Sequence, residues 1–427
     1  MGRDYQPTLA WGNPFTVYLR YTRMEYDDTR RAREFASRTR EFLEEEVIPV
    51  EREVLGSGPA SEEQLETLRE AARERELYAP HLPEEYGGQG LSYRDMLPVF
   101  EAAGRSLLGP AALRVDAPDE GNMHTLELFG TDEQKGEWLE PLVAGEARSG
   151  FSMTEPIQGG GSDPKMLETE AEKEGDEWIL DGHKWWTTQG SEADVLIVMA
   201  RTDPEAHPYA GCSLFLVPSD TEGVEIVRDI PHVGGEVTGM SHAEIRYDGV
   251  RIPEENLLGE RNEGFSHAQQ RLGPARLTHC MRYSGMAERA LDVTKAYVSE
   301  REAFGESLGE KQSVRFTIAE AETNLHAART MVRHAAREID SGGEARIPVS
   351  MAKVFAANTV QDVIDDCLQL CGANGIGKDL PIADFYENVR QFRLVDGADE
   401  VHKRVIAREA LNDMDPREIE AITRYEG

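Results

Sequence analysis

Two polar blocks of this 427-residue chain have residue types that could hold a ligand. The first reads Phe-Ser-Met-Thr-Glu-Pro at 151–156, and Gly-Gly-Gly-Ser-Asp follows it at 159–163. Hydroxyl groups and glycines with free backbone N–H groups can bind an anion or a polar heterocycle at close approach. From the glycines alone, a plain connection between two elements is the competing interpretation.

The second block reads His-Lys-Trp-Trp-Thr-Thr-Gln-Gly at 183–190. If this block is a strand, Trp185 and Trp186 point to opposite faces. One tryptophan then enters a core, while the other can stack on a flat ligand. Thr188 falls on the same face as Trp186, which predicts a hydroxyl beside that ligand.

Several kinds of chemistry have no motif in this sequence. It contains no G-x-S-x-G, no H-E-x-x-H, no Walker A loop, and no G-x-G-x-x-G opening a βαβ unit. Its four cysteines are scattered and its eleven histidines lack paired ligand spacing, so we expect neither a disulfide framework nor a metal site.

The charge of the chain restricts its partners and environment. With 80 acidic against 46 basic residues, the net charge of −34 disfavours nucleic acid and anionic membranes. The acid is spread along the chain and only nine residues are lysine, a pattern typical of a high-salt cytoplasm. An ordinary acidic cytosolic protein is the alternative. No run approaches the roughly 20 apolar residues of a membrane span, and the N-terminus lacks a signal-peptide pattern, so we expect a cytoplasmic protein.

The elements that must position these blocks fall into three parts after an extension at 1–23. Helical spacing dominates residues 24–150, short apolar runs bounded by turn residues dominate 151–265, and longer amphipathic helices return over 266–427. The predicted fold is therefore α+β and multidomain. Its parts are an N-terminal all-α domain, a middle antiparallel β domain and a C-terminal four-helix bundle.

From about Met24 onward, the sequence resembles the acyl-CoA dehydrogenase family. The resemblance depends on blocks in the family order, each weak alone and highly specific together. They are Gly-Thr…Gln-Lys…Trp-Leu…Pro-Leu…Gly-Glu over 130–146, Met-Thr-Glu-Pro at 153–156, Gly-Ser-Asp at 161–163, Gly-x-Lys-x-Trp-x-Thr-x-Gly at 182–190, Glu-Arg-x-x-Phe-Gly at 300–305 with Gln312, and Gln-x-x-Gly-x-Asn-Gly at 369–375.

The resemblance implies a site for FAD and for an acyl-CoA. Thr154 and its neighbour Met153 would bind the pyrimidine side of the flavin, Trp186 would flank the ring system, and Thr188 would lie near the nitrogen that accepts the hydride. Substrate contacts would come from Ser162, Arg276 and Gly397. A second group would reach the FAD of a neighbouring subunit, which implies a homotetramer or homodimer: Arg301, Phe304, Gln312, Gln369, Gly372 and Gly375. An electron-transfer flavoprotein is the electron acceptor that the family implies.

The same resemblance implies that Asp396 is the catalytic base. Members of the family usually carry a glutamate before the glycine at this position, and some place it where Ala275 stands here. The chemistry would be α,β-dehydrogenation to the trans-2-enoyl-CoA, with the α-proton passing to Asp396 and a hydride passing to the flavin. An aspartate carboxylate lies about an ångström further back than that of glutamate, so backbone or substrate must compensate. Asp399 and Glu400 are expected to face solvent in the first turn of a helix.

Two other functions remain open on the sequence alone. Nitroalkane oxidases resemble this family and also use an aspartate base, but they return electrons to oxygen. A non-catalytic flavoprotein that binds acyl-CoA would not need the Asp396 carboxylate. An aspartate base is also typical of a subgroup whose substrates are longer, branched or hydroxylated acyl chains.

Overall fold

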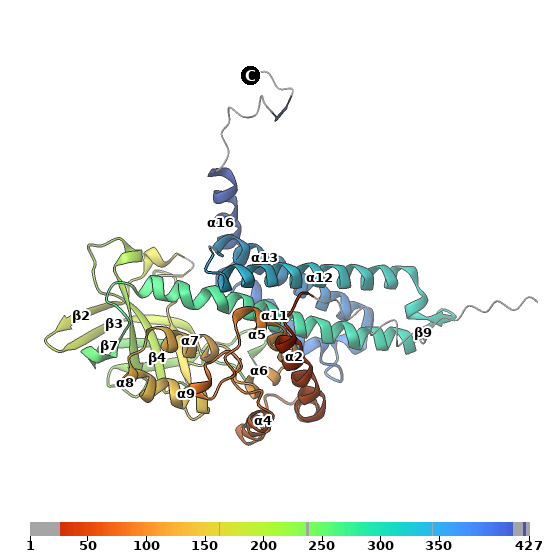
Figure 1. Cartoon of the computed structure of the whole chain (residues 1–427), viewed down its shortest axis with the longest axis horizontal. Helices are drawn as coiled ribbons and strands as arrows, with labels where there is room; N and C mark the ends of the chain where they lie inside the picture. The colour runs from red at the N-terminus through yellow and green to blue at the C-terminus, as the bar shows by residue number, and fades with distance from the viewer. Residues whose placement is uncertain (1–25, 162, 236–238, 344, 413–421, 424–427) are drawn as a thin grey trace, which may run out of the picture.

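The computed structural model describes residues 26–161, 163–235, 239–343, 345–412 and 422–423. The extension predicted at 1–23 lies outside these residues. Figure 1 shows a β sheet at one end of the molecule, and long helices that run from it to the opposite end. The described chain contains no helix that is both long and apolar enough to cross a membrane.

The N-terminal part is helical, as the sequence predicts. Side-chain caps define where several helices begin: Thr29 accepts from Ala32 N, and Ser61 forms a capping box with Gln64. The helices are α2 (Arg30–Phe42), α3 (Ile48–Val54), α4 (Glu62–Glu74), α5 (Tyr93–Ala103), α6 (Gly109–Ala112), α7 (Asp119–Phe129), α8 (Asp132–Gln134) and α9 (Glu140–Ala144).

The middle part is an eight-stranded sheet with the order β6-β7-β3-β2-β4-β5-β8, and β1 pairs with β4. The strands are β1 (Ser149–Ser152), β2 (Glu170–Glu174), β3 (Glu177–Thr188), β4 (Val195–Arg201), β5 (Cys212–Pro218), β6 (Val224–Asp229), β7 (His242–Pro253) and β8 (Leu257–Leu258). The prediction of a purely antiparallel sheet is wrong in one respect. Because β2 lies between β3 and β4, the chain crosses over, and β4 pairs in parallel with both β1 and β2.

The continuous apolar runs of β4 and β5 follow from burial on both faces. Ile197 packs in the core shared with the helices, whereas Leu196 and Val198 pack in a second core on the other face of the sheet. A strand covered on both sides needs no polar alternation. The sheet therefore fixes the end of β1 and the end of β3 between two cores.

The C-terminal part is built on three long helices, α11 (Gly264–Glu300), α12 (Gln312–Asp340) and α13 (Arg346–Cys371). A short hairpin of β9 (Glu302–Ala303) and β10 (Glu306–Ser307) joins α11 to α12. The shorter helices α14 (Ala373–Ile376), α15 (Ile382–Val389) and α16 (Asp399–Asn412) follow. The last of these, α16, packs on α13 and points away from the three long helices (Figure 1).

The helix α11 connects the two ends of the molecule. Its 37 residues correspond to about 55 Å at 1.5 Å per residue. It begins against β5 beside the sheet and ends at the β9–β10 hairpin, and along its course it packs on α5, α7, α12 and α13. The helices α12 and α13 run back and forth beside it, so the start of α13 lies near the sheet and its end lies near the hairpin.

Candidate active site

A cavity of about 2050 Å³ lies where the sheet meets the start of α11 and the segment before α16. Pockets for drug-sized ligands measure about 300–1,000 Å³, so this cavity has room for more than one such ligand. Its lining includes seven of the fourteen predicted site residues: Met153, Thr154, Trp186, Thr188, Arg276, Asp396 and Gly397. Ser162, predicted to contact substrate, lies outside the described residues.

The loop after β1 is held by a buried ion pair. Lys184 Nζ donates to Glu155 Oε1 and to the Met153 carbonyl, each at 2.9 Å, and both charged side chains are buried. Glu155 also accepts from Thr169 and from backbone N–H groups of the loop, so its carboxylate is fully engaged. Although burial opposes ionisation, Lys184 and these donors lower the pKa of Glu155. The pair fixes the backbone that presents Thr154 to the cavity.

The two tryptophans do not follow the predicted alternation. Trp186 has a φ of 56°, and the register of β3 against β7 shifts between Lys184 and Thr187. This bulge turns both tryptophans to the cavity, so neither enters a core as expected. The buried tryptophan is Trp178, further back in β3.

Thr188 is held by a histidine from the neighbouring strand. Its Oγ1 lies 3.0 Å from His242 Nδ1 on β7. Burial lowers the pKa of His242 to about 4, so this imidazole is neutral near pH 7. The hydroxyl of Thr188 is therefore oriented at the cavity wall by a neutral partner.

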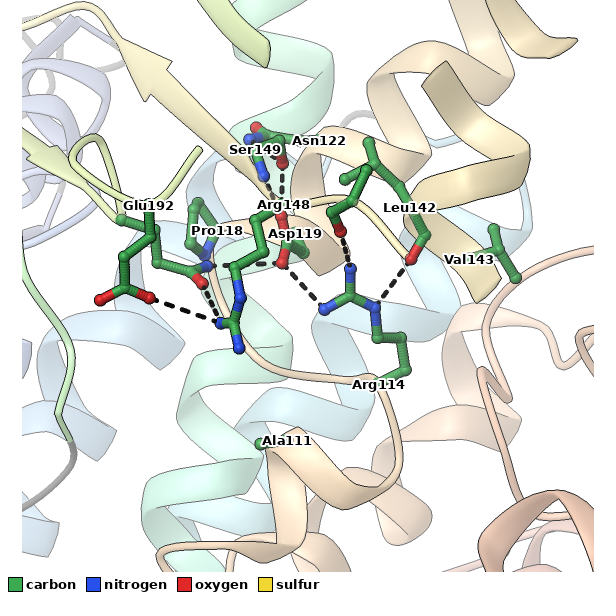
Figure 2. A network of polar contacts seen from close by, with 12 residues as sticks. Ala111, Arg114, Pro118, Asp119, Asn122, Leu142, Val143, Arg148, Ser149 and Glu192 are labelled. Atoms are coloured by element: carbon green, nitrogen blue, oxygen red, sulfur yellow. Dashed lines mark hydrogen bonds and ion pairs between the residues drawn. The ribbon is translucent and has the colours of Figure 1, made fainter. Parts of the chain in front are cut away.

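A buried polar network ties these strand ends to the N-terminal helices (Figure 2). Arg114 donates to Asp119 Oδ2 at 2.9 Å and to the carbonyls of Leu142 and Ala147. Asp119 Oδ1 accepts from the backbone N–H of Ser149 at 2.8 Å and from its hydroxyl at 2.5 Å. The network fixes Ser149, the first residue of β1, between Arg148 and Phe151, which both line the cavity.

The predicted base lies at an unusual backbone corner. Asp396 and Gly397 have φ angles of 54° and 97°. Aspartate is one of the few L residues that visit the left-handed region readily, and glycine does so without steric cost. Two donors reach the Asp396 carbonyl, Arg276 Nε at 2.9 Å and His402 Nε2 at 3.2 Å, and Lys353 Nζ donates to the Gly397 carbonyl at 2.9 Å. These donors fix the backbone position of Asp396 and Gly397.

The charges around Asp396 favour its carboxylate form. Burial alone would raise its pKa, but facing groups on α11 and α13 outweigh burial and lower it: His279, Arg271, Arg276 and Lys353. Burial and the nearby Arg282 lower the pKa of His279 to about 4. Near pH 7, the corner therefore holds an ionised Asp396 beside a neutral His279.

The expectation that Asp399 faces solvent is wrong. Asp399 is buried at the start of α16, and its Oδ2 accepts from Arg393 Nε at 2.8 Å and Asn358 Nδ2 at 3.0 Å. These partners come from the preceding turn and from α13, where the sequence gives no local signal of them. Glu400 is exposed, as expected.

The second group of predicted residues lies far from the cavity. Arg301, Phe304, Gln312, Gln369, Gly372 and Gly375 are not part of its lining. They gather at the opposite end of the long helices, around the end of α11, the β9–β10 hairpin, the start of α12 and the end of α13. Phe304 is 96% exposed at the tip of the hairpin.

Sequence reasoning missed three residues of the site: His242, His279 and Lys353. His279 lies one helical turn after Ala275 on the same face as Arg276, so helical spacing could have found it. Lys353 and His242 lie 43 and 154 residues before Asp396 in the sequence. Only the three-dimensional structure brings them to the site.

A helical domain, a sheet and a helical bundle that share a large cavity with a buried carboxylate define the architecture of an acyl-CoA dehydrogenase. Models of that family match this chain in order: its N-terminal domain at 29–146, its middle domain at 150–250 and its C-terminal domain at 262–411. The chain therefore belongs to the acyl-CoA dehydrogenase family.

Individual relatives agree with this assignment. The chain is 40% identical over 401 residues to a Mycobacterium tuberculosis protein named probable acyl-CoA dehydrogenase FadE2, covering 91% of this chain and 97% of that protein. It is 36% identical to acyl-CoA dehydrogenase family member 11 of Gallus gallus, covering 90% of this chain and 51% of that protein. The chain thus spans about half the length of the chicken relative. A solved structure from Mycobacterium abscessus, assigned to the acyl-CoA dehydrogenases, has a TM-score of 0.84 and 39% identity, covering 90% of this chain and 99% of that one.

Proposed function

We propose that this protein is an FAD-dependent acyl-CoA dehydrogenase that converts an acyl-CoA thioester to the trans-2-enoyl-CoA, with Asp396 as the base. One observation supports the proposal above all. The ionised Asp396 carboxylate lines the same cavity as Thr154, Trp186 and Thr188, which come from the other side of the domain boundary. A base and a surface for a flat cofactor therefore face one enclosed volume.

The lining of the cavity fits a flavin. Trp186 offers an aromatic surface, and the loop at Met153 and Thr154, fixed by the Lys184–Glu155 pair, offers polar groups at its edge. Bound FAD would supply the acceptor for the hydride from the β-carbon. We propose that a neighbouring copy completes its site with Arg301, Phe304, Gln312, Gln369, Gly372 and Gly375, which makes the protein a homo-oligomer.

Asp396 takes the proton that leaves the α-carbon. The α-hydrogen of a thioester is weakly acidic, so the base must be positioned in advance and the developing negative charge must be stabilised. Arg276 and Gly397 line the cavity beside Asp396, where they would contact the thioester end of the substrate. Arg271 and Arg276 add positive potential where that charge develops.

A smaller chamber suggests where an acyl chain would end. It measures about 400 Å³ and shares Arg271, Pro274 and Ala275 with the main cavity. We propose that the acyl chain runs past Asp396 toward this chamber, that an electron-transfer flavoprotein accepts the electrons, and that the protein works in a salt-rich cytoplasm.

Anaerobic titration of the wild type and Asp396→Asn against a panel of acyl-CoAs tests the proposed function. Because a positioned general base contributes about 10²–10⁴-fold, we expect flavin bleaching at least about 100-fold slower in Asp396→Asn, with FAD content unchanged. Glu400→Gln, an exposed carboxylate four residues on, is the control and should behave as the wild type.

Two results would contradict the proposal. Equal bleaching of wild type and Asp396→Asn would remove Asp396 from the role of base. Flavin that no acyl-CoA reduces, but that a nitroalkane reduces with uptake of oxygen, would assign the protein to the oxidases instead.

A further inference from the structure

One histidine nitrogen at the Asp396 corner lies near two acceptors. His279 Nδ1 is 2.7 Å from the carbonyl of Ala275, one turn earlier in α11, and 3.2 Å from Asp396 Oδ2. A carbonyl oxygen only accepts, so Nδ1 must carry the proton. The Ala275 carbonyl thereby fixes the tautomer of His279, and Nδ1 also lies close enough to the carboxylate for electrostatic attraction, although no hydrogen bond joins them.

The two oxygens of Asp396 have different surroundings. Oδ2 is inaccessible to solvent and has no hydrogen bond of normal geometry. The side chain is nevertheless 16% exposed, so the exposed part belongs to its remaining atoms, which include Oδ1. Because Asp396 lines the cavity, the Oδ1 side is the one available to a ligand.

The histidine itself has little freedom to move. Its ring stacks on Phe392 at 6.2 Å between centroids with planes inclined by 18°, and Phe392 in turn stacks on Tyr283. The side chain is 13% exposed. The imidazole is therefore a fixed part of the wall behind the carboxylate.

The other charged groups around Asp396 act elsewhere. Arg276 and His402 bind its backbone carbonyl, and Lys353 binds the carbonyl of Gly397. Arg271 from α11 and Glu120 from α7 face it at longer range. Among the residues that the structure describes, His279 alone has a basic nitrogen within 4.0 Å of the carboxylate oxygens.

We propose that His279 is a positioning residue for the reaction, and that the positive end of its Nδ1–H dipole, 3.2 Å from Oδ2, attracts that oxygen so that Oδ1 receives the α-proton. This inference rests on the proposed function, in which Asp396 is the base. The proton leaves the α-carbon for Oδ1, and the electron pair of that C–H bond stays with the substrate. Oδ2 then becomes the carbonyl oxygen of a neutral carboxyl group, whose partial negative charge is still attracted to the Nδ1–H dipole, so the contact survives the step.

Two substitutions distinguish the effect of the N–H donor from the effect of the ring that carries it. His279→Phe keeps a flat ring against Phe392 and removes the donor, whereas His279→Asn loses the ring and keeps a nitrogen donor at the position of Nδ1. A misplacement of about 1 Å can cost about a hundredfold in rate. We expect flavin reduction at saturating acyl-CoA to be about ten- to a hundredfold slower in His279→Phe, with substrate affinity nearly unchanged, and mostly restored in His279→Asn.

A second measurement reads the carboxylate without substrate. Infrared difference spectra over a pH series report protonation of Asp396, and the band is assigned by its loss in Asp396→Asn. An N–H dipole close to Oδ2 favours the charged form, so His279→Phe should raise the pKa of Asp396 and His279→Asn should leave it near that of the wild type. His334→Phe, the same change on the exposed side of α12, is the control for both measurements.

The outcomes distinguish this inference from the proposed function. If Asp396→Asn abolishes reduction while His279→Phe changes neither the rate nor the infrared titration, the base assignment stands and the positioning role is wrong. Equal losses in His279→Phe and His279→Asn would mean that ring packing, not the N–H, matters, which also overturns the role. Retained reduction in Asp396→Asn would overturn both.

Discussion

The two ends of the long helices differ in how completely this single chain satisfies their side chains. At the sheet end, the Asp396 corner is enclosed, and Arg276, His402 and Lys353 engage its backbone carbonyls. At the hairpin end, Phe304 is 96% exposed, and Ile376 just beyond α13 is 67% exposed. The sheet end is packed like a protein interior, whereas the hairpin end leaves large apolar side chains exposed to solvent.

The turn of the hairpin makes the second half of this comparison specific. Phe304 and Gly305 both have positive φ angles, 55° and 89°, as a type I′ turn requires. Phenylalanine rarely adopts the left-handed backbone conformation, and here that conformation projects the aromatic ring into solvent. Phe304 and Ile376, both apolar and exposed at this end, are therefore candidates for contact with a neighbouring copy. Under the proposed function, the difference means that the catalytic corner is built within one chain, whereas the cofactor site is shared between two chains.

The largest expected effect comes from adding one methyl group at the enclosed end. A Cβ on Gly397 would lie 2.9 Å from His402 Nε2, and the φ of +97° is strained for alanine. We expect Gly397→Ala to displace the Asp396 carbonyl from His402 and to slow flavin reduction by roughly a hundredfold. Stopped-flow reduction by the best acyl-CoA measures this effect.

A matched glycine isolates the contact from the backbone strain. Gly58 has a similar φ of +108°, but nothing lies within 4 Å of the Cβ it would carry. Gly58→Ala should lower stability slightly and leave the reduction rate unchanged. Equal rates in Gly397→Ala and the wild type would contradict the view that the corner is fixed by its donors.

The next effect belongs to the exposed end. Phe304→Ser removes an aromatic ring that contacts almost nothing within the chain, so the stability of a single chain should hardly change. If a neighbouring copy uses this ring, FAD affinity should fall about tenfold and the oligomer should weaken, while the reduction rate per bound FAD stays the same. Flavin absorbance after dialysis and light scattering with size-exclusion chromatography measure both. Leu411→Ser, 73% exposed on α16 and away from the hairpin, is the control; similar losses there would mean that general surface hydrophobicity is responsible.

Salt concentration should also affect the hairpin end, by a smaller factor than the Phe304 substitution. Chains that each carry −34 repel one another on assembly, and raising salt from 0.1 to 1 M shortens the screening length from about 10 to 3 Å. We expect oligomer affinity and FAD retention to rise several-fold in molar KCl, while the reduction rate of assembled protein changes little. Dissociation on adding salt would show instead that ion pairs hold the copies together.

Much of this architecture could be predicted from the sequence because burial patterns are local. The apolar runs of β4 and β5 were identifiable since both faces of each strand are buried, and the long amphipathic helices expected in the C-terminal part correspond to α11, α12 and α13. The strand β2 was missed. It reads Glu-Ala-Glu-Lys-Glu and buries only Ala171, so composition gives no apolar signal.

The residues that line the site could be predicted from the sequence, but their geometry could not. The family motifs predicted that Thr154, Trp186, Thr188 and Asp396 belong to one site, and all four line one cavity. The bulge at Trp186 could not be predicted, because a positive φ in a tryptophan leaves no mark in the sequence. The burial of Asp399 and the role of Lys353 depend on α13, which folds back from more than 40 residues away.

The smallest expected effect is that of pH on the enclosed end. The pKa of Asp396 lies below its ordinary value, because the facing His279, Arg271, Arg276 and Lys353 outweigh the effect of burial. The active form of a base is the unprotonated one, and kcat/KM reports the groups of the free enzyme. An aspartate is ordinarily ionised above about pH 4, so a lowered pKa keeps Asp396 ionised throughout pH 5–8.

His242, His279 and His402 have pKa values lowered by burial to about 4, so they stay neutral over the same range. We therefore expect kcat/KM to vary by less than about twofold between pH 5 and 8, where a solvent-exposed histidine near pKa 6.5 would give a clear limb. A limb near pH 6 to 7 that disappears in His279→Phe would mean that His279 titrates beside the base, and that the enclosed end is more open to water than its burial indicates.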